Sequence, residues 1–259
     1  MFSRIICEKK SGVCTVTLNR PEKLNALDRT MRQELDSAFA DVASDRSIRV
    51  IIVQGAGRSF CAGADVSQFL SGELGTSGAV AMITRHLLKT IESCPQIVVF
   101  KLHGHVLGGG LEMALAGDLR IASDDSELGF PETGIGMIPG SGGTQRLPRI
   151  VGFAKAKEML FLGSRISASE AERIGLVHRA VPKDKLDSSV DEITAQLLKR
   201  APVALAAAKS AVNKVWDYTN LDSGLVWERE LVNLCAETHD RREGLLAMKE
   251  KRAPNFNGV

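Results

Sequence analysis

The 259-residue sequence predicts a mixed α/β fold that continues into an all-helical C-terminal region. Two observations predict it. Short apolar runs of strand type alternate with helical patterns up to about residue 195, and strand-like runs stop after Pro182. A composition of 44% hydrophobic and 25% charged residues is ordinary for a globular protein with a sizeable core. We therefore expect a core over residues 1–195 and a helical region over residues 196–259.

The elements of the core follow from local patterns. Residues 13–18 alternate like a strand, and residues 27–42 form an amphipathic helix with Asp28 as its N-cap. Buried strands follow at 49–54 and 96–102, with a further strand at 119–122. Helices are expected at 79–93 and 109–116, and a Gly/Ser-rich surface loop at 70–78. The tail predicts four helices, at 185–199, 202–215, 221–237 and 240–249.

Charge and cysteine content argue against several classes of protein. A net charge of +2 gives no global attraction to nucleic acid or membrane. Five cysteines with no C-x-x-C pair indicate a reducing compartment and no disulfide framework. We see neither a signal peptide nor an apolar run of about 18 residues. The expected compartment is the cytoplasm, or the mitochondrial matrix if a transit peptide has been removed.

Three segments rich in glycine and small residues are the main functional signal. They read FCAGAD at 60–65, LGGGLE at 107–112, and FPE at 130–132 leading into GSGGT at 140–144. The first two predict loops that turn into helix starts, which present free backbone N–H groups and a positive dipole end. Two such starts facing one point stabilise the oxygen of a thioester as it becomes an enolate. Nearby carboxyls could then move protons without a metal or redox cofactor.

Glu112 and Glu132 are the candidate carboxyls. From spacing alone, a solvated glutamate at a helix start is the more frequent reading of Glu112. Its neighbours Leu111, Met113 and Ala114 favour burial instead, where an unpartnered carboxylate is costly and points to function. Glu132 lies in a Gly-rich loop, a usual place for catalytic groups.

These segments, in this order and spacing, resemble the crotonase (enoyl-CoA hydratase/isomerase) superfamily. The resemblance spans nearly the whole chain, from VTLNRPEKLNAL at 16–27 through the three segments and residues 139–148 to DRREG at 240–244 and EKR at 250–252. It implies the crotonase-type ββα spiral with a C-terminal trimerisation region, and self-association as a trimer or a dimer of trimers. It also implies reversible hydration of a 2-enoyl-CoA thioester, with no cofactor because coenzyme A is part of the substrate.

The resemblance also assigns roles to residues. The N–H groups of Ala64 and Gly109 would form the oxyanion hole. Glu112 would orient and deprotonate water while Glu132 protonates Cα, although the family shows that the pair can share these roles. The implied CoA-binding residues are Lys23, Ala26, Ala62, Asp65, Val66 and Lys251, the last from a neighbouring subunit. Residues 68–78 and 82–87 would wall the acyl pocket.

Two alternatives stay open. A Δ3,Δ2-enoyl-CoA isomerase needs only one carboxylate, so the retention of both favours a hydratase. A crotonase-like RNA-binding protein would need a basic surface, which a net charge of +2 does not support. His103 and His105 lack further residues at metal-ligand spacing, and Cys61 is more typical of a small buried hydrophobe, so we expect structural roles for all three.

Overall fold

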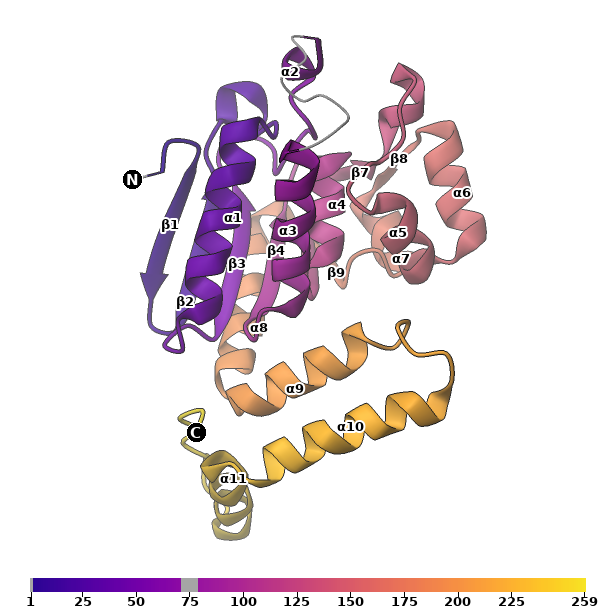
Figure 1. Cartoon of the computed structure of the whole chain (residues 1–259). Coiled ribbons are helices and arrows are strands. Elements are labelled where there is room, and N and C mark those ends of the chain that lie inside the picture. The colour runs from indigo at the N-terminus through magenta and orange to yellow at the C-terminus, as the bar shows by residue number, and fades with distance from the viewer. Residues whose placement is uncertain (1, 71–78) are drawn as a thin grey trace.

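The computed structural model describes residues 2–70 and 79–259. Residues 71–78 lie outside the described residues. They make up nearly all of the loop expected at 70–78 and most of the expected acyl-pocket segment at 68–78. The remaining chain forms an α/β body with an arm of helices below it (Figure 1). No helix among the described residues is long and apolar enough to cross a membrane.

A six-stranded sheet forms the centre of the body. Its order is β1-β2-β3-β4-β6-β9; β1 and β2 pair antiparallel, and every later neighbour pairs parallel. Parallel pairing explains the near-continuous apolar runs, because helices then cover both faces of the sheet. The strands are β1 Ile5–Lys10, β2 Val13–Leu18, β3 Val50–Gly55, β4 Ile97–Leu102, β6 Leu119–Ser123 and β9 Arg179–Val181.

Alternation along β3 divides the core into two layers. Ile51 and Val53 face a large cluster that includes side chains of α1 (Arg29–Ser44) and α3 (Ala79–Ser93). Val50 and Ile52 face a smaller cluster under α8 (Leu186–Leu198). Asp28 caps α1 by accepting a hydrogen bond from the Met31 N–H at 2.7 Å, so the expected cap is confirmed.

A second, three-stranded sheet carries the glycine-rich segments. It consists of β5 (His105–Leu107), β7 (Glu127–Gly129) and β8 (Arg165–Ser167), in the order β5-β7-β8. Helix α4 (Gly109–Ala116) starts directly after β5, and the short 3-10 helix η2 (Pro131–Ile135) follows β7. Both sequence-predicted glutamates thus lie just beyond neighbouring parallel strands. Further helices complete this part of the body: α5 Gly143–Val151, α6 Phe153–Leu162 and α7 Ala168–Arg173.

The C-terminal helices form the arm seen at the bottom of Figure 1. They are α9 (Pro202–Asn213), α10 (Leu221–Ala236) and α11 (His239–Glu250), close to the expected ranges, and no strand follows β9 in the described chain. Lys209 fixes α9 to the body through a buried ion pair with Asp118 at 2.8 Å. The expected division at residue 195 falls in the last turn of α8, and it stays a prediction.

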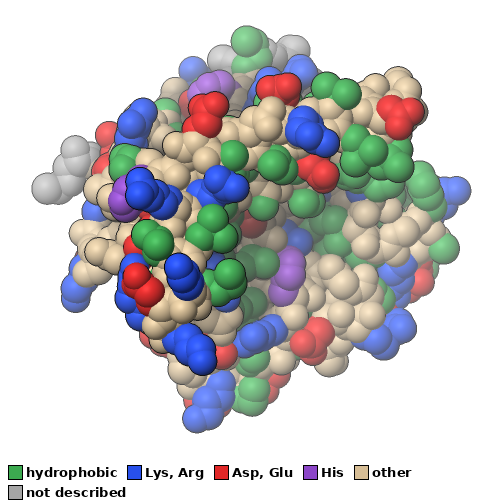
Figure 2. Space-filling view, turned by 90° about the horizontal axis from the view of Figure 1, so that it is seen from below, with side chains coloured by type: hydrophobic (Ala, Val, Ile, Leu, Met, Phe, Trp, Pro, Cys, Tyr) green, Lys and Arg blue, Asp and Glu red, His purple; other side chains and the backbone are tan. Residues whose placement is uncertain are grey.

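The arm exposes many apolar side chains. Seen from below, the molecule is hollowed, and hydrophobic side chains gather in the hollow and on its rim (Figure 2). None of the residues of α10, all of which are described, is buried. The large exposed apolar residues of the arm are Val212, Val215, Trp216, Leu221, Leu225, Val226, Val232, Leu234, Leu245, Leu246 and Met248.

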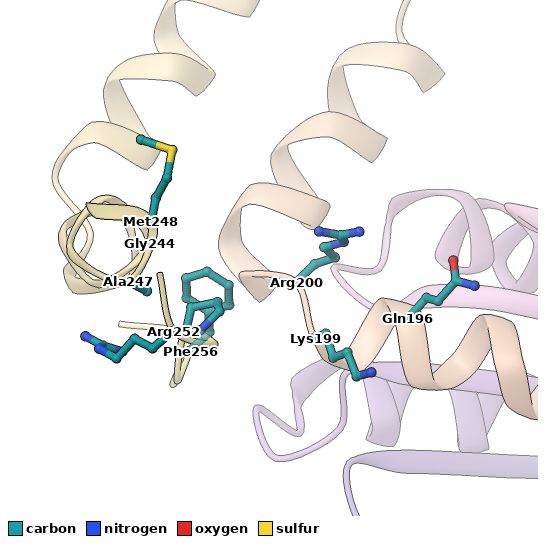
Figure 3. A pocket seen from close by; sticks show the side chains of 9 residues that line it. Gln196, Lys199, Arg200, Gly244, Ala247, Met248, Arg252 and Phe256 are labelled. Carbon is teal, nitrogen blue, oxygen red and sulfur yellow. The ribbon is translucent and has the colours of Figure 1, made fainter. Parts of the chain in front are cut away.

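A cavity of about 550 Å³ separates α11 and the C-terminal tail from the α8–α9 junction. Figure 3 shows Arg252 and Phe256 on one side of it and Lys199 and Arg200 on the other. Arg252 is already paired with Glu243 and Glu250, each at 2.6 Å. This cavity includes none of the sequence-predicted site residues.

Candidate active site

Glu112 is a buried carboxylate held by backbone donors. It lies in the first turn of α4, whose residues from Gly110 to Ala116 are all buried, and it is only 3% exposed. Its Oε1 accepts the N–H groups of Ser141 at 2.6 Å and Gly143 at 2.8 Å. These charge-assisted hydrogen bonds offset the desolvation of the carboxylate. Neither of them involves Oε2, which remains for another partner.

The loop at 140–143 presents the Gly143 N–H because it leads into a helix, whereas Ser141 precedes the N-cap. Gly142, at φ +101°, is the N-cap of α5, and the first N–H groups of a helix have no intrahelical acceptor. Helix α5 begins directly after this N-cap, at Gly143. What the sequence analysis missed is that Ser141 and Gly143 hold Glu112. The available signal was the Gly-Ser-Gly-Gly run before a helix, because the free backbone N–H groups at a helix start bind anions such as a carboxylate.

Glu132 has a different environment. It lies in η2, where Pro131 takes the first helical position. Its Oε2 is buried without a hydrogen-bond partner in the described structure. Burial raises the pKa of Glu132 from its ordinary value of 4.5 to about 7, and the negative charge of Glu112 adds to the rise. Glu132 can therefore hold or release a proton near neutral pH.

The two glutamates approach the same helix start. A side chain built on Gly108 would place its Cβ 2.8 Å from Glu132 Oε1, and Gly108 has φ +50°. Only glycine satisfies both conditions without strain. Glu112 lies one turn further along the same helix, so the start of α4 lies between the two carboxyls.

Ala64 and Gly109 bring two backbone N–H groups to this place. Parallel bridges join Ala64 to Leu27 and Cys61 to Val106, which fixes the 61–64 segment beside β5. A Cβ on Gly109 would lie 3.8 Å from the Ala64 nitrogen. Among the described residues, no acceptor takes the N–H of Ala64 or Gly109, whereas the Gly108 N–H donates to Gly129 O at 3.0 Å. Two free donors thus lie side by side, as an oxyanion site requires.

The expected CoA-binding segments also lie together. Ala62 N–H donates to Leu24 O at 2.9 Å, and Leu27 N–H donates to Gly63 O at 2.8 Å. Lys23 is exposed, and Val66, at the start of α2 (Val66–Leu70), is 55% exposed.

A buried arginine links these two segments. Arg20 donates to Ala26 O at 2.7 Å and pairs with Asp65 at 3.0 Å. The Asp65 carboxylate is therefore engaged within the protein, and its backbone is engaged as well, since its N–H donates to Leu27 O at 3.2 Å and its carbonyl accepts from the Gln68 N–H at 3.1 Å. Sequence reasoning missed Arg20, which also pairs with Asp28 at 3.2 Å and whose partner Asp65 lies 45 residues away.

Lys251 lies apart from the other site residues. It is the left-handed C-cap of α11, at φ +54°, and α11 occupies the far end of the arm in Figure 1, away from α4. Within one chain, the structure does not bring Lys251 to Glu112 and Glu132. The expected contact from a neighbouring subunit stays a prediction.

The motifs expected to be structural take part in ordinary contacts. His103 is in contact with Gly57 O at 3.0 Å, and His105 approaches Glu127 at 3.3 Å. Cys61 is fully buried, and burial raises its thiol pKa to about 11. Within the described residues, no three His, Cys, Asp or Glu side chains come together as a metal site would need.

Comparison with known proteins shows the family of the chain. Residues 8–259 match the family described as enoyl-CoA hydratase/isomerase. The chain is 36% identical to the short-chain-enoyl-CoA hydratase of Clostridium acetobutylicum, over 97% of this chain and 96% of that protein. It is 35% identical to the crotonyl-CoA hydratase of Syntrophomonas wolfei, over 98% of each.

A solved structure shows the same fold. The enoyl-CoA hydratase of Bacillus anthracis is 36% identical, with a TM-score of 0.93 that covers 99% of this chain and 100% of that chain. The architecture is therefore the crotonase α/β spiral expected from the sequence. The chain belongs to the enoyl-CoA hydratase/isomerase family of enzymes, the crotonase superfamily.

Proposed function

We propose that this enzyme adds water reversibly across the Cα=Cβ bond of a 2-enoyl-CoA thioester, giving a 3-hydroxyacyl-CoA. One observation supports this above the others. Two glutamates with different environments flank one helix start that also presents a free N–H group beside that of Ala64. The relatives named as hydratases of short-chain enoyl-CoA and crotonyl-CoA support the substrate class.

The proposed steps conserve atoms and charge. Glu112, as a carboxylate, takes a proton from water while the water oxygen bonds to Cβ. The π electrons move through Cα to the thioester oxygen, whose negative charge is stabilised by the N–H groups of Ala64 and Gly109. Protonated Glu132 then donates to Cα, and the thioester carbonyl re-forms. The proton taken up by Glu112 returns to Glu132 through solvent, which resets the pair.

The CoA part of the substrate would lie along the 23–26 and 62–66 segments. Lys23 offers a surface charge for phosphate, whereas Ala26, Ala62, Asp65 and Val66 would lie along the adenine and pantetheine. Lys251 would reach CoA from a second subunit. We therefore propose a trimer, or a dimer of trimers, built through the exposed apolar residues of the arm.

A turnover panel tests the reaction. Straight-chain, branched and alicyclic 2-enoyl-CoA thioesters are supplied separately, and loss of the enoyl-thioester absorbance reports hydration. We expect hydration of at least one acyl shape. A 3-enoyl-CoA substrate is included, because conversion of it without any hydration of 2-enoyl-CoA would assign the isomerase reaction instead.

Light scattering tests the assembly. At micromolar concentration we expect the mass of three or six chains, since no residue of α10 is fully buried within its own chain. A monomeric mass would contradict both the trimer and the contribution of Lys251 from a neighbouring subunit.

A further inference from the structure

Loop 140–143, which donates hydrogen bonds to Glu112, is itself fixed by the ion pair between Arg146 and Glu92. Arg146, in the first turn of α5, donates from Nη1 to Ser141 O at 2.9 Å. Its Nε donates to Glu92 Oε1, on α3, at 2.6 Å. The same guanidinium lies so close to Gly142 that a Cβ there would come within 2.2 Å of Nη1.

The contacts form one continuous chain from α3 to the carboxylate. Glu92 fixes Arg146, Arg146 fixes the carbonyl of Ser141, and the N–H of the same Ser141 donates to Glu112. Gly143, two residues on, supplies the second donor. Because the peptide groups on both sides of the Ser141 Cα are hydrogen-bonded, the loop has little freedom to turn its N–H groups away from Glu112.

Arg146 and Glu92 do not contact the reacting groups. Both line a cavity of about 1330 Å³ between α3, α5 and α9, together with Ser141 and Gly142, whereas neither Glu112 nor Glu132 lines it. Their side chains are 20% and 37% exposed, so the pair is reached by solvent on the cavity side. An exposed ion pair contributes little to stability, yet this one joins α3 to the stretch that runs from loop 140–143 into α5.

We propose that Arg146, braced by Glu92, is a positioning residue that holds loop 140–143 and thereby aims the Glu112 carboxylate at the water it deprotonates. The inference rests on the proposed role of Glu112. A misplacement of about 1 Å in a catalytic group can reduce the rate about 100-fold without preventing substrate binding. The signature of this role is therefore a fall in kcat with little change in KM.

The test compares Arg146→Gln with Arg149→Gln, in the full-length enzyme. Arg149 lies one turn along the same helix and donates to Gln145 O within it, so its loss leaves the loop untouched. We expect kcat of Arg146→Gln to fall about 10- to 100-fold with KM changed less than about threefold, while Arg149→Gln stays near wild type. Glu92→Gln should lose less, since its amide oxygen can still accept from Arg146 Nε.

A double-mutant cycle separates positioning from a general structural effect. If Arg146 acts through Glu112, then Arg146→Gln should reduce the single-turnover rate of the Glu112→Gln enzyme by less than about twofold. A full additional loss in that background, or wild-type kcat in Arg146→Gln alone, would overturn the inference. If Arg146→Gln does not fold by circular dichroism, Arg146→Lys serves instead, because one ammonium cannot reproduce the forked contact to Glu92 and Ser141.

The outcomes also separate this inference from the proposed function. Wild-type turnover by Glu112→Gln would show that Glu112 takes no part in the mechanism. Arg146 would then have no catalytic group to position. Loss of turnover in Glu112→Gln combined with normal turnover in Arg146→Gln would refute only the positioning role of Arg146. The proposed role of Glu112 would stand.

Discussion

The two glutamates of the site follow neighbouring parallel strands, yet their surroundings differ in kind. Glu112 is the more deeply buried, and its carboxylate is matched by two backbone donors from loop 140–143. Glu132 is only half-buried, but one of its oxygens lacks a partner and its pKa rises to about 7. Burial alone therefore does not decide what a carboxyl can do. The donors supplied by the surrounding backbone decide whether it serves as a held base or as a proton donor near neutral pH.

Replacing either carboxyl is the most severe test of this difference. Glu112→Gln and Glu132→Gln should each reduce hydration about 10²–10⁴-fold, because an amide neither takes the proton of water nor delivers one to Cα. The fold should survive in both. In Glu112→Gln the new amide oxygen can still accept from Ser141 and Gly143, and in Glu132→Gln the side chain is neutral at every pH. Steady-state kinetics at saturating and limiting substrate measure the loss.

Glu127→Gln is the matched control for these variants. Glu127 lies on β7, five residues before Glu132, is exposed, and pairs with Arg165 at 3.1 Å. We expect it to keep wild-type kinetics. Near-normal turnover in either site variant would show that its carboxyl takes no part in the chemistry.

Gly109→Val tests the proposed oxyanion site, which lies at the helix start between the two carboxyls. A valine Cβ at Gly109 would approach Leu27 Cδ1 to 3.3 Å, beside the Ala64 nitrogen. We expect a loss in kcat/KM worth more than about 2 kcal/mol of transition-state stabilisation, roughly 30-fold, because the oxyanion loses one aligned donor. Circular dichroism checks that the variant is folded.

The structure also determines which glycine can serve as control. Gly108 cannot, because its positive φ and its closeness to Glu132 Oε1 would make Gly108→Val harmful for reasons unrelated to the oxyanion. Gly134, in η2, has open space around its Cβ position. If Gly134→Val reduces kcat/KM as much as Gly109→Val, the N–H of Gly109 has no special role.

Local sequence patterns predicted the long elements, but not the strands β1, β5, β7, β8 and β9 and not the contacts between loops. Helix α3 at 79–93 and helix α4 at 109–116 begin and end where their patterns indicated. The alternation of strand-type runs with helical patterns predicted the α/β body. Burial of Glu112 followed from its apolar neighbours. The donors to Glu112 did not, because they come from 29 and 31 residues away. Such pairings depend on how loops meet in space, which periodicity within one segment does not contain.

The pH dependence of the rate separates the roles of the two carboxyls. Hydration needs Glu132 in its protonated form, so kcat/KM should fall as pH rises through about 7, approaching tenfold per pH unit above it. Glu132→Gln should lose this limb of the profile while keeping its low residual rate. A wild-type profile that stays flat from pH 6 to about 9 would contradict the assignment of Glu132 as the acid.

The smallest expected effect concerns stability, and it comes from the same carboxyl. The folded-state pKa of Glu132, about 7, lies above its ordinary value of 4.5. The folded protein therefore binds this proton more tightly than the unfolded chain, and the free energy of unfolding falls as pH rises from about 4.5 to 7. Glu132→Gln removes that loss, so it should match wild type near pH 4.5 and be more stable at pH 8.

Solvent reaches part of the Glu132 side chain, so the gain should be on the order of 1 kcal/mol, which raises Tm by about 2–4 °C in a chain of this size. Thermal unfolding of both proteins at pH 4.5, 6 and 8 measures it. Glu127→Gln should show no such pH-dependent gain, since Glu127 is exposed. A less stable Glu132→Gln at pH 8 would mean that the charged form of Glu132 is favoured by the fold, and that the contrast with Glu112 does not arise from missing donors.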